Sequence, residues 1–253
     1  MEQHAPVYRK NPENKGLVMF IHGFMGSPVQ FTGLIDAAYD HGYSVAALLL
    51  PGHGGTAKEF AKGTYEQWQN HVDNEVKRYS QEYEKILPVG HSMGGLLAVN
   101  ASVKFPEVIN GIFMIATPFF NAKLSLYSIK IRIKQIFSRK DDPIKAVYLS
   151  NSSIEMSPSL LWNTGRPNSE LKILMNIARS NLPKVTVPVT AVFSSADELT
   201  SMENIKILKN ELHDTLLYEV IISESLHAYY TKHDQTIIEE SLIQALNKIK
   251  GGQ

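Results

Sequence analysis

The pentapeptide Gly90–Gly94, with the sequence Gly-His-Ser-Met-Gly, constrains this chain more than any other part of its sequence. An apolar run, Lys85–Val89, precedes it, and a stretch of helical character follows it as far as Lys104. A G-x-S-x-G sequence between a strand and a helix is typical of a sharp turn that holds a serine in a strained, exposed position. Glycines at both ends leave out the Cβ atoms that would collide in such a turn. The motif therefore predicts a strand–turn–helix unit with Ser92 at its apex.

Short apolar runs alternate with amphipathic stretches along most of the chain, which is typical of a parallel sheet covered by helices. Runs bounded by turn residues predict strands at 17–21, 43–50, 85–89, 108–116, 185–194 and 216–222. Helical spacing predicts helices at 29–40, 64–79, 201–212 and 235–249. Thr64 with Gln67, and Thr200 with Glu203, form capping-box pairs at two of the helix starts. The expected architecture is α/β: a mostly parallel sheet with helices on both faces.

Pro88 falls inside one of the predicted central strands. Proline has no backbone N–H, so it removes a ladder hydrogen bond from a central strand. We therefore expect that strand's pairing to end before Pro88, or a bulge to lie there.

The alternation breaks between about residues 119 and 183. This segment contains a basic run, Lys123–Lys140, then turn-rich pieces and a helical stretch near Glu170–Ser180. We interpret 119–183 as an inserted cap on a core formed by residues 1–118 and 184–253.

The basic run carries an apolar stripe with helical spacing, although residues 129–133 also alternate as a strand would. The stripe consists of Leu126, Ile129, Ile133, Ile136 and Phe137. In a cap, it would cover the pocket, with Ile129 and Ile133 as candidate lining residues and the basic side chains in water. Transient contact with a lipid aggregate and binding of a partner protein stay open as alternative interpretations.

A serine hydroxyl needs a base to take its proton and an acid to orient that base. Asp197 and His227 follow the last two predicted strands, and carboxyl ends of parallel strands are where such sheets place their sites. Together with Ser92 they have the chain order Ser, Asp, His that accompanies this type of turn. We predict these three residues as a catalytic triad. Glu198 is the nearest rival acid, and Asp234 fits the order poorly because it comes after His227.

The oxyanion that develops during acyl transfer needs two hydrogen-bond donors. The backbone N–H of Met93, directly after the serine, is one candidate, and the loop after the first strand offers the N–H of Phe24. His22 and His91 flank the expected site and are candidates for the substrate pocket. No metal is expected, because the histidines lack the spacing of a metal motif such as His-Glu-x-x-His.

Several of these segments resemble the carboxylesterase and monoacylglycerol-lipase branch of the α/β-hydrolases: His22–Phe24, Pro51–Gly54, Gly90–Gly95, an Asp after the penultimate strand and a late His. The likeness covers nearly the whole chain outside the cap. The resemblance implies the α/β-hydrolase fold and hydrolysis of carboxylic esters through an acyl-serine intermediate without a cofactor. Expected substrates are small-molecule esters, either short- to medium-chain acyl esters or monoacylglycerol-like lipids.

Two alternative functions stay open. The same triad could hydrolyse another acyl bond, such as an amide, a thioester or a carbon–carbon bond. A catalytically silent scaffold that binds a small molecule or a partner protein agrees less well with an intact triad. Dehalogenase and epoxide-hydrolase chemistry is disfavoured, because the turn carries serine where those reactions need aspartate.

Composition limits the binding partners and the cellular compartment that we expect for this protein. The 25 Lys and Arg balance the 25 Asp and Glu, so no global field attracts nucleic acid. The absence of cysteine excludes disulfides, thiolate metal sites and a cysteine nucleophile. No stretch approaches the ~18 apolar residues of a membrane span, and the polar residues 1–15 lack the apolar region of a secretory signal. We expect a soluble cytoplasmic protein, and the sequence predicts no particular oligomeric state.

Overall fold

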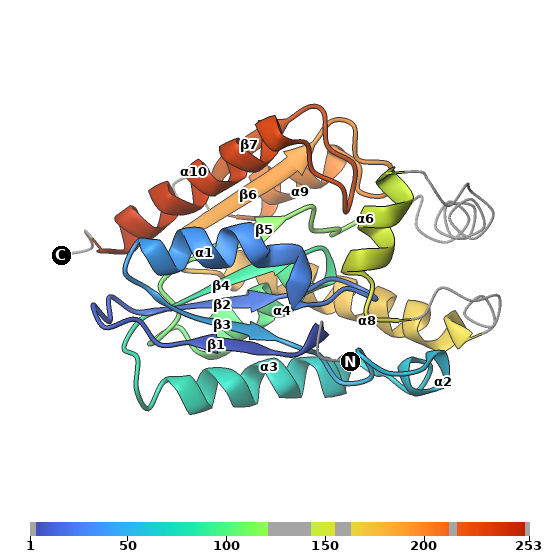
Figure 1. Cartoon of the computed structure of the whole chain (residues 1–253), viewed down its shortest axis with the longest axis horizontal. Helices are drawn as coiled ribbons and strands as arrows, with labels where there is room; N and C mark the ends of the chain where they lie inside the picture. Colours follow the sequence, from blue (N-terminus) through green and yellow to red (C-terminus); the bar gives the residue numbers. More distant parts are fainter. Residues whose placement is uncertain (1–3, 121–142, 155–162, 213–216, 251–253) are drawn as a thin grey trace.

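A computed structural model describes residues 4–120, 143–154, 163–212 and 217–250. Within them, seven strands form one sheet in the order β1-β3-β2-β4-β5-β6-β7 (Figure 1). Only β1 runs antiparallel to its neighbour, β3, and the other neighbouring pairs are parallel. The strands are β1 (Val7–Arg9), β2 (Leu17–Ile21), β3 (Ser44–Leu48), β4 (Ile86–His91), β5 (Ile112–Ile115), β6 (Val189–Ser194) and β7 (Leu217–Ile222). The predicted mostly parallel sheet is confirmed.

Helices cover both faces of this sheet (Figure 1). α1 and α10 pack on one face, and α3, α4, α8 and α9 pack on the other. Strands β2, β3 and β4 are buried along their whole length, as expected for parallel strands covered on both sides. The described helices are η2 (Pro28–Phe31), α1 (Thr32–Asp40), α2 (Ala57–Phe60), α3 (Tyr65–Tyr79), α4 (Met93–Lys104), α6 (Pro143–Asn151), α8 (Gly165–Asn181), η3 (Leu182–Lys184), α9 (Glu203–Glu211) and α10 (Lys232–Lys250).

One of the two predicted capping boxes is correct. The Thr64 side chain accepts from the Gln67 N–H at the start of α3, and Gln67 bonds back to the Thr64 N–H. The predicted Thr200–Glu203 box is wrong, because α9 begins after Met202 without a side-chain cap. The Thr200 hydroxyl instead donates to the Ala116 carbonyl oxygen, at 3.2 Å, so it joins two loops at the end of the sheet.

Pro88 lies inside strand β4, opposite Met19 of β2. On the β5 side, an isolated bridge joins Ile86 to Ile109, and the regular ladder begins only at Val89 opposite Phe113. Between those two pairs β4 advances three residues (86 to 89) while its neighbour advances four (109 to 113). The strand therefore continues through Pro88, and the irregularity that accommodates the missing N–H lies in the neighbouring segment.

Two helices of the segment 119–183 are described, and they occupy different places. α8, which the sequence predicts near Glu170–Ser180, buries Leu171, Leu174, Met175 and Ala178 in the same cluster as α4. α6 lies beside the carboxyl ends of the strands (Figure 1). The apolar stripe of the basic run, with its candidate lining residues Ile129 and Ile133, lies outside the described residues.

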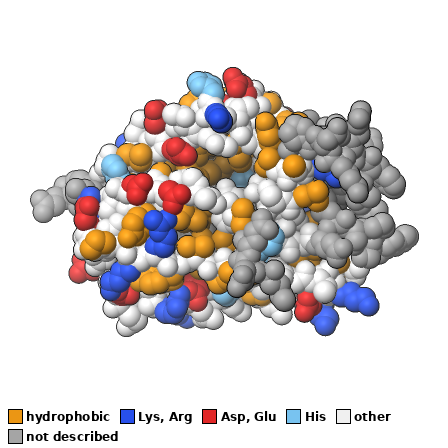
Figure 2. Space-filling view, viewed as in Figure 1, with side chains coloured by type: hydrophobic (Ala, Val, Ile, Leu, Met, Phe, Trp, Pro, Cys, Tyr) orange, Lys and Arg blue, Asp and Glu red, His pale blue; other side chains and the backbone are white. Residues whose placement is uncertain are grey.

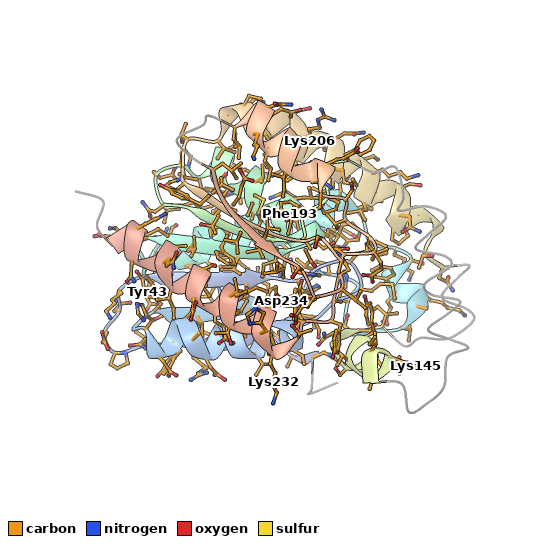
Figure 3. The ribbon with its side chains drawn as sticks, turned by 90° about the horizontal axis from the view of Figure 1, so that it is seen from above. Tyr43, Lys145, Phe193, Lys206, Lys232 and Asp234 are labelled. Carbon is orange, nitrogen blue, oxygen red and sulfur yellow. The ribbon has the colours of Figure 1, made fainter. Side chains whose placement is uncertain are left out.

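The last helix, α10, packs against residues of the first half of the chain. The Tyr43 hydroxyl donates to the Leu246 carbonyl oxygen at 3.0 Å, and Tyr43 lies beside the later part of α10 in Figure 3. Asp234, near the start of the same helix, lies toward the end of the molecule that carries α6 (Figure 3). This helix therefore runs from the loops at the sheet's carboxyl end back to its amino end.

Charged side chains of both signs are interspersed on the face that Figure 2 presents. Of the helices in the described part of the chain, none is both long and apolar enough to cross a membrane.

Candidate active site

Ser92 occupies the turn between β4 and α4 in a strained backbone conformation. Its φ of 51° and ψ of −115° lie in a region that residues with a Cβ rarely adopt. The turn is tight, because a Cβ on Gly94 would lie only 1.8 Å from the Ile21 carbonyl oxygen. The side chain of Ser92 thereby emerges at the carboxyl end of the sheet, next to the loop that follows β2.

Because that Cβ would collide with backbone, Gly94→Ala is expected to destabilise the protein by about 3 kcal/mol or more. Urea unfolding monitored by circular dichroism measures the change. Gly165→Ala is the matched control, since nothing lies within 4 Å of a Cβ at that position. We expect it to change the free energy of unfolding by less than about 1 kcal/mol. Equal stability of the two variants would contradict the described turn.

Three side chains predicted as a triad form a continuous hydrogen-bonded chain. The Nε2 of His227 lies 3.0 Å from the Ser92 Oγ, and its Nδ1 lies 2.9 Å from the Asp197 Oδ2. The other carboxylate oxygen of Asp197 accepts the N–H groups of Leu199 and Thr200, at 2.7 and 2.8 Å. These bonds fix the carboxylate, so that Oδ2 faces the imidazole.

The electrostatics of this chain favour a charged Asp197 and a protonatable His227. Burial lowers the pKa of His227, but the charge and hydrogen bond of Asp197, together with the charge of Glu198, outweigh it and raise that pKa above its ordinary 6.5. Burial would raise the pKa of Asp197, but its interactions with His227 and the two backbone N–H groups hold that pKa below its ordinary value. The imidazole can therefore take a proton while Asp197 stays ionised.

The loop of His227 is anchored by Asp234, which is 1% exposed. One oxygen of this carboxylate accepts both the Ser225 hydroxyl, at 2.6 Å, and the Glu224 N–H, at 3.0 Å. The Ser194 hydroxyl, at the end of β6, donates to the Ser225 carbonyl oxygen. Asp234 thus holds the shape of the loop through Glu224 and Ser225.

The His227 carbonyl oxygen accepts two further hydrogen bonds. The His91 Nε2 lies 2.8 Å from it, and the Tyr230 hydroxyl lies 3.1 Å from it. Burial lowers the pKa of His91 to about 3, so this ring is neutral, and its Nε2 must carry the proton that it donates. His91 is therefore a donor that fixes the backbone of His227.

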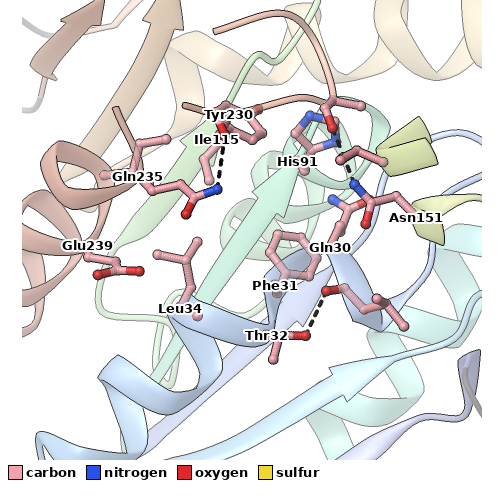
Figure 4. Close-up of a pocket in the computed structure, with 15 residues that line it drawn as sticks. Gln30, Phe31, Thr32, Leu34, His91, Ile115, Asn151, Tyr230, Gln235 and Glu239 are labelled. Carbon is pink, nitrogen blue, oxygen red and sulfur yellow. Dashed lines mark hydrogen bonds between the residues drawn. The ribbon is translucent and has the colours of Figure 1, made fainter. Parts of the chain in front are cut away.

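His91 and Tyr230 also line a cavity of about 260 Å³ between η2, α1, α6 and α10 (Figure 4). Its walls combine apolar side chains such as Phe31, Leu34 and Ile115 with polar ones such as Gln235. The predicted pocket residue His91 thus lines a cavity. His22 is not part of this lining and is fully buried.

The loop after β2 lies directly against Ser92. A Cβ on Gly23 would be 3.1 Å from the Ser92 Cβ. This loop, which carries Phe24, is held by His53, whose Nε2 accepts the Met25 N–H at 3.2 Å. Burial lowers the pKa of His53 to about 4, which keeps that acceptor nitrogen unprotonated near neutral pH. On the opposite side, Met93 is the first residue of α4, where unpaired backbone N–H groups concentrate positive potential.

His22 connects two loops from inside the protein. Its Nε2 accepts the Leu50 N–H at 3.0 Å, and its Nδ1 lies 2.9 Å from the Gly23 carbonyl oxygen. Burial lowers its pKa well below the ordinary value, so the ring is neutral. Among the described residues, no three His, Asp or Glu side chains gather in a group that could hold a metal ion.

Sequence reasoning missed several residues that shape this site. They are Tyr148, Asn151, Glu198 as a partner of the His227 backbone, Tyr230 and Asp234. Their contacts depend on how loops fold back at the end of the sheet, and none of them belongs to a short motif. The only available signal was the closeness of Glu198 to Asp197 in the sequence.

Comparison with known proteins identifies the class. The family model described as the alpha/beta hydrolase fold matches residues 16–143, just over half of the chain. The chain belongs to this family.

Individual relatives that cover most of the chain share about a quarter of its residues. The chain is similar to the thermostable monoacylglycerol lipase of Bacillus sp. (strain H-257), with 24% identity over 242 residues that cover 92% of this chain and 91% of that protein. It is 23% identical over 236 residues to a carboxylesterase of Bacillus subtilis (strain 168), with 92% of each chain covered. A solved structure from a study of LipS and LipT, two metagenome-derived lipolytic enzymes, has a TM-score of 0.78 at 23% identity, covering 98% of this chain and 99% of that one. That structural likeness supports the fold.

Proposed function

We propose that this protein is a carboxylic ester hydrolase that works through an acyl-serine intermediate. The observation that carries the proposal is the hydrogen-bonded chain from Ser92 through His227 to Asp197, with distances of 3.0 and 2.9 Å, at a strained turn beside the loop that carries Phe24. A serine becomes an effective nucleophile in this arrangement, because the imidazole can accept its proton as it attacks.

The reaction follows from the roles of these groups. The Ser92 Oγ attacks the ester carbonyl carbon and passes its proton to the His227 Nε2, while Asp197 stabilises the imidazolium. The N–H groups of Phe24 and Met93 bind the oxyanion. When the tetrahedral intermediate collapses, His227 protonates the departing alcohol. Water then attacks the acyl-serine with His227 as base, which releases the acid and restores Ser92.

The proposed substrates are short- to medium-chain acyl esters or monoacylglycerol-like lipids. The relatives named as a monoacylglycerol lipase and a carboxylesterase support this substrate class. We propose that α6, the described helix of the segment 119–183 that contacts the loop of His227, belongs to a cap that limits the acyl chain. Contact of its basic run with lipid stays a prediction from the sequence.

A series of p-nitrophenyl esters from acetate to decanoate tests this function. Each buried methylene contributes up to ~0.8 kcal/mol, so kcat/KM is expected to rise more than tenfold from acetate toward medium chains. The octanoyl anilide and the octanoyl thioester are the matched controls for the bond cleaved. Faster cleavage of either control than of the p-nitrophenyl octanoate would transfer the function to another acyl bond, and no turnover of any ester would contradict the proposal.

A further inference from the structure

Helix α6 contacts both catalytic loops that bring the acid and the base to Ser92. Its Asn151 Nδ2 donates to the carbonyl oxygen of Ala228, the residue after His227, at 3.2 Å (Figure 4). Its Tyr148 hydroxyl donates to Glu198 Oε1, next to Asp197 in the chain. The loops of Asp197 and His227 are therefore tied to the same helical turn of the segment 119–183.

Glu198 connects Tyr148 to the catalytic histidine. While Oε1 accepts the Tyr148 hydroxyl, Oε2 accepts the backbone N–H of His227 at 2.9 Å. One carboxylate thus spans the gap between α6 and the peptide that carries the imidazole. The His227 carbonyl oxygen is held by His91 and Tyr230, so the backbone N–H and the backbone C=O of His227 are both fixed.

The same helix end also holds the loop that carries Phe24. The Ser27 hydroxyl donates to the Asn151 carbonyl oxygen at 3.2 Å, and the Ser153 N–H donates to the Met25 carbonyl oxygen at 3.0 Å. Ser27 and Met25 belong to the segment that carries Phe24. Helix α6 and the residues just after it therefore contact three loops around Ser92, those that carry Asp197, His227 and Phe24.

We propose that Glu198 and Tyr148 are positioning residues for His227: the Glu198 carboxylate holds the His227 peptide, and the Tyr148 hydroxyl holds that carboxylate from α6. Neither residue touches the reacting atoms. The kinetic test of this inference rests on the proposed function. The NMR test does not, because it measures only the pKa of the His227 imidazole.

The pKa of His227 is a readout of the Glu198 charge, and a merely structural role of Glu198 would not change that pKa. The titratable groups around His227 are Asp197 and Glu198 from the loop after β6, His91 from β4, Tyr230 from its own loop and Tyr148 behind Glu198. His91 is neutral, so the two carboxylates are the charges that raise the pKa of His227 against burial. Removal of one of them should lower that pKa.

The direct test is an NMR titration of the His227 imidazole in protein labelled with ¹³C-histidine, with the resonance assigned by its loss in His227→Gln. Glu198→Gln is expected to lower the His227 pKa by about 0.5–1 unit, since it removes one nearby negative charge. Glu203→Gln is the matched control: the same substitution, five residues along, on an exposed side chain at the start of α9. It should leave the pKa within about 0.2 unit, because a distant exposed charge is screened.

Enzyme kinetics distinguish the role of Glu198 from that of Tyr148. In the wild-type protein kcat/KM for p-nitrophenyl acetate should rise with pH through an apparent pKa above 6.5, since His227 must be neutral to act as base. Glu198→Gln should shift this limb to lower pH. Tyr148→Phe keeps the charge, so the limb should stay in place while kcat falls about three- to tenfold, the size of one lost hydrogen bond. Leu149→Ala, an exposed position on the same helix, should match the wild type.

Two results would overturn the inference. Equal His227 titrations in Glu198→Gln and Glu203→Gln would remove Glu198 from its role, and wild-type kcat in Tyr148→Phe would remove Tyr148. If Glu198→Gln does not fold, Glu198→Asp takes its place: its charge should keep the His227 pKa near the wild-type value, while its shorter side chain should release the His227 peptide and lower kcat. Wild-type kcat in Glu198→Asp would then remove Glu198 from its role. Absence of any ester hydrolysis by the wild type would count against the proposed function, while the NMR titration would still decide the role of Glu198.

Discussion

Ser92→Ala is expected to lower kcat/KM for p-nitrophenyl esters by at least ~10⁴-fold, because the variant has no oxygen to form the acyl intermediate. The hydroxyl is small and alanine keeps the Cβ, so the fold should survive. Steady-state hydrolysis measures the loss, and thermal unfolding checks that the variant is folded. A folded Ser92→Ala protein with more than a tenth of wild-type activity would contradict the assignment of the nucleophile.

The companion variants show whether the three residues act as a unit. His227→Ala should match Ser92→Ala, and the double variant should be no slower than either one, since members of a triad are not additive. Asp197→Asn should lose somewhat less. Wild-type activity in Asp197→Asn would transfer the role of the acid to Glu198, whose carboxylate already reaches the His227 backbone.

Phe24→Pro is expected to lower kcat by about 10²–10³-fold, the usual cost of one lost oxyanion donor. Proline removes the backbone N–H that we propose as a donor, in a loop whose Gly23 lies against Ser92. Hydrolysis of p-nitrophenyl acetate under saturating substrate gives kcat directly.

Phe24→Ala separates the donor from the side chain. The Phe24 ring packs edge-on against Phe60 and Trp68, with centroid distances of 5.0 and 6.3 Å. Its removal should therefore affect stability and substrate affinity more than kcat, because the N–H remains. The comparison requires circular dichroism spectra that match the wild type. A folded proline variant with full activity would refute the role of Phe24 as a donor.

The sheet and the turn at Ser92 could be predicted because each depends on local sequence. Apolar runs bounded by turn residues correspond to strands that are buried on both faces, and the glycine spacing around Ser92 permits only a tight turn. Boundaries were less accurate where tertiary contacts decide them. The predicted strand 108–116 is regular only over Ile112–Ile115, because its first part pairs through the single bridge at Ile109.

The hydrogen bonds that hold the loops of the site could not be predicted, because they form between segments that are distant in the sequence. Thr200 has the sequence pattern of a helix cap, yet its hydroxyl bonds to the Ala116 carbonyl oxygen, which no local rule anticipates. Asp234 appeared only as a poor candidate for the acid, and its contact with Ser225 depends on the turn that precedes α10. Tyr148 lies in a segment without a strand–helix pattern, so its approach to Glu198 has no sequence signal.

The most direct measurement of the proposed chemistry is covalent labelling with a fluorophosphonate, followed by intact-mass analysis and peptide mapping. We expect one phosphonyl group per chain, on the peptide that contains Ser92, with loss of ester hydrolysis in proportion to labelling and no label on Ser92→Ala. A label on another residue, or full hydrolysis by protein whose Ser92 is phosphonylated, would contradict the role of Ser92 as the nucleophile.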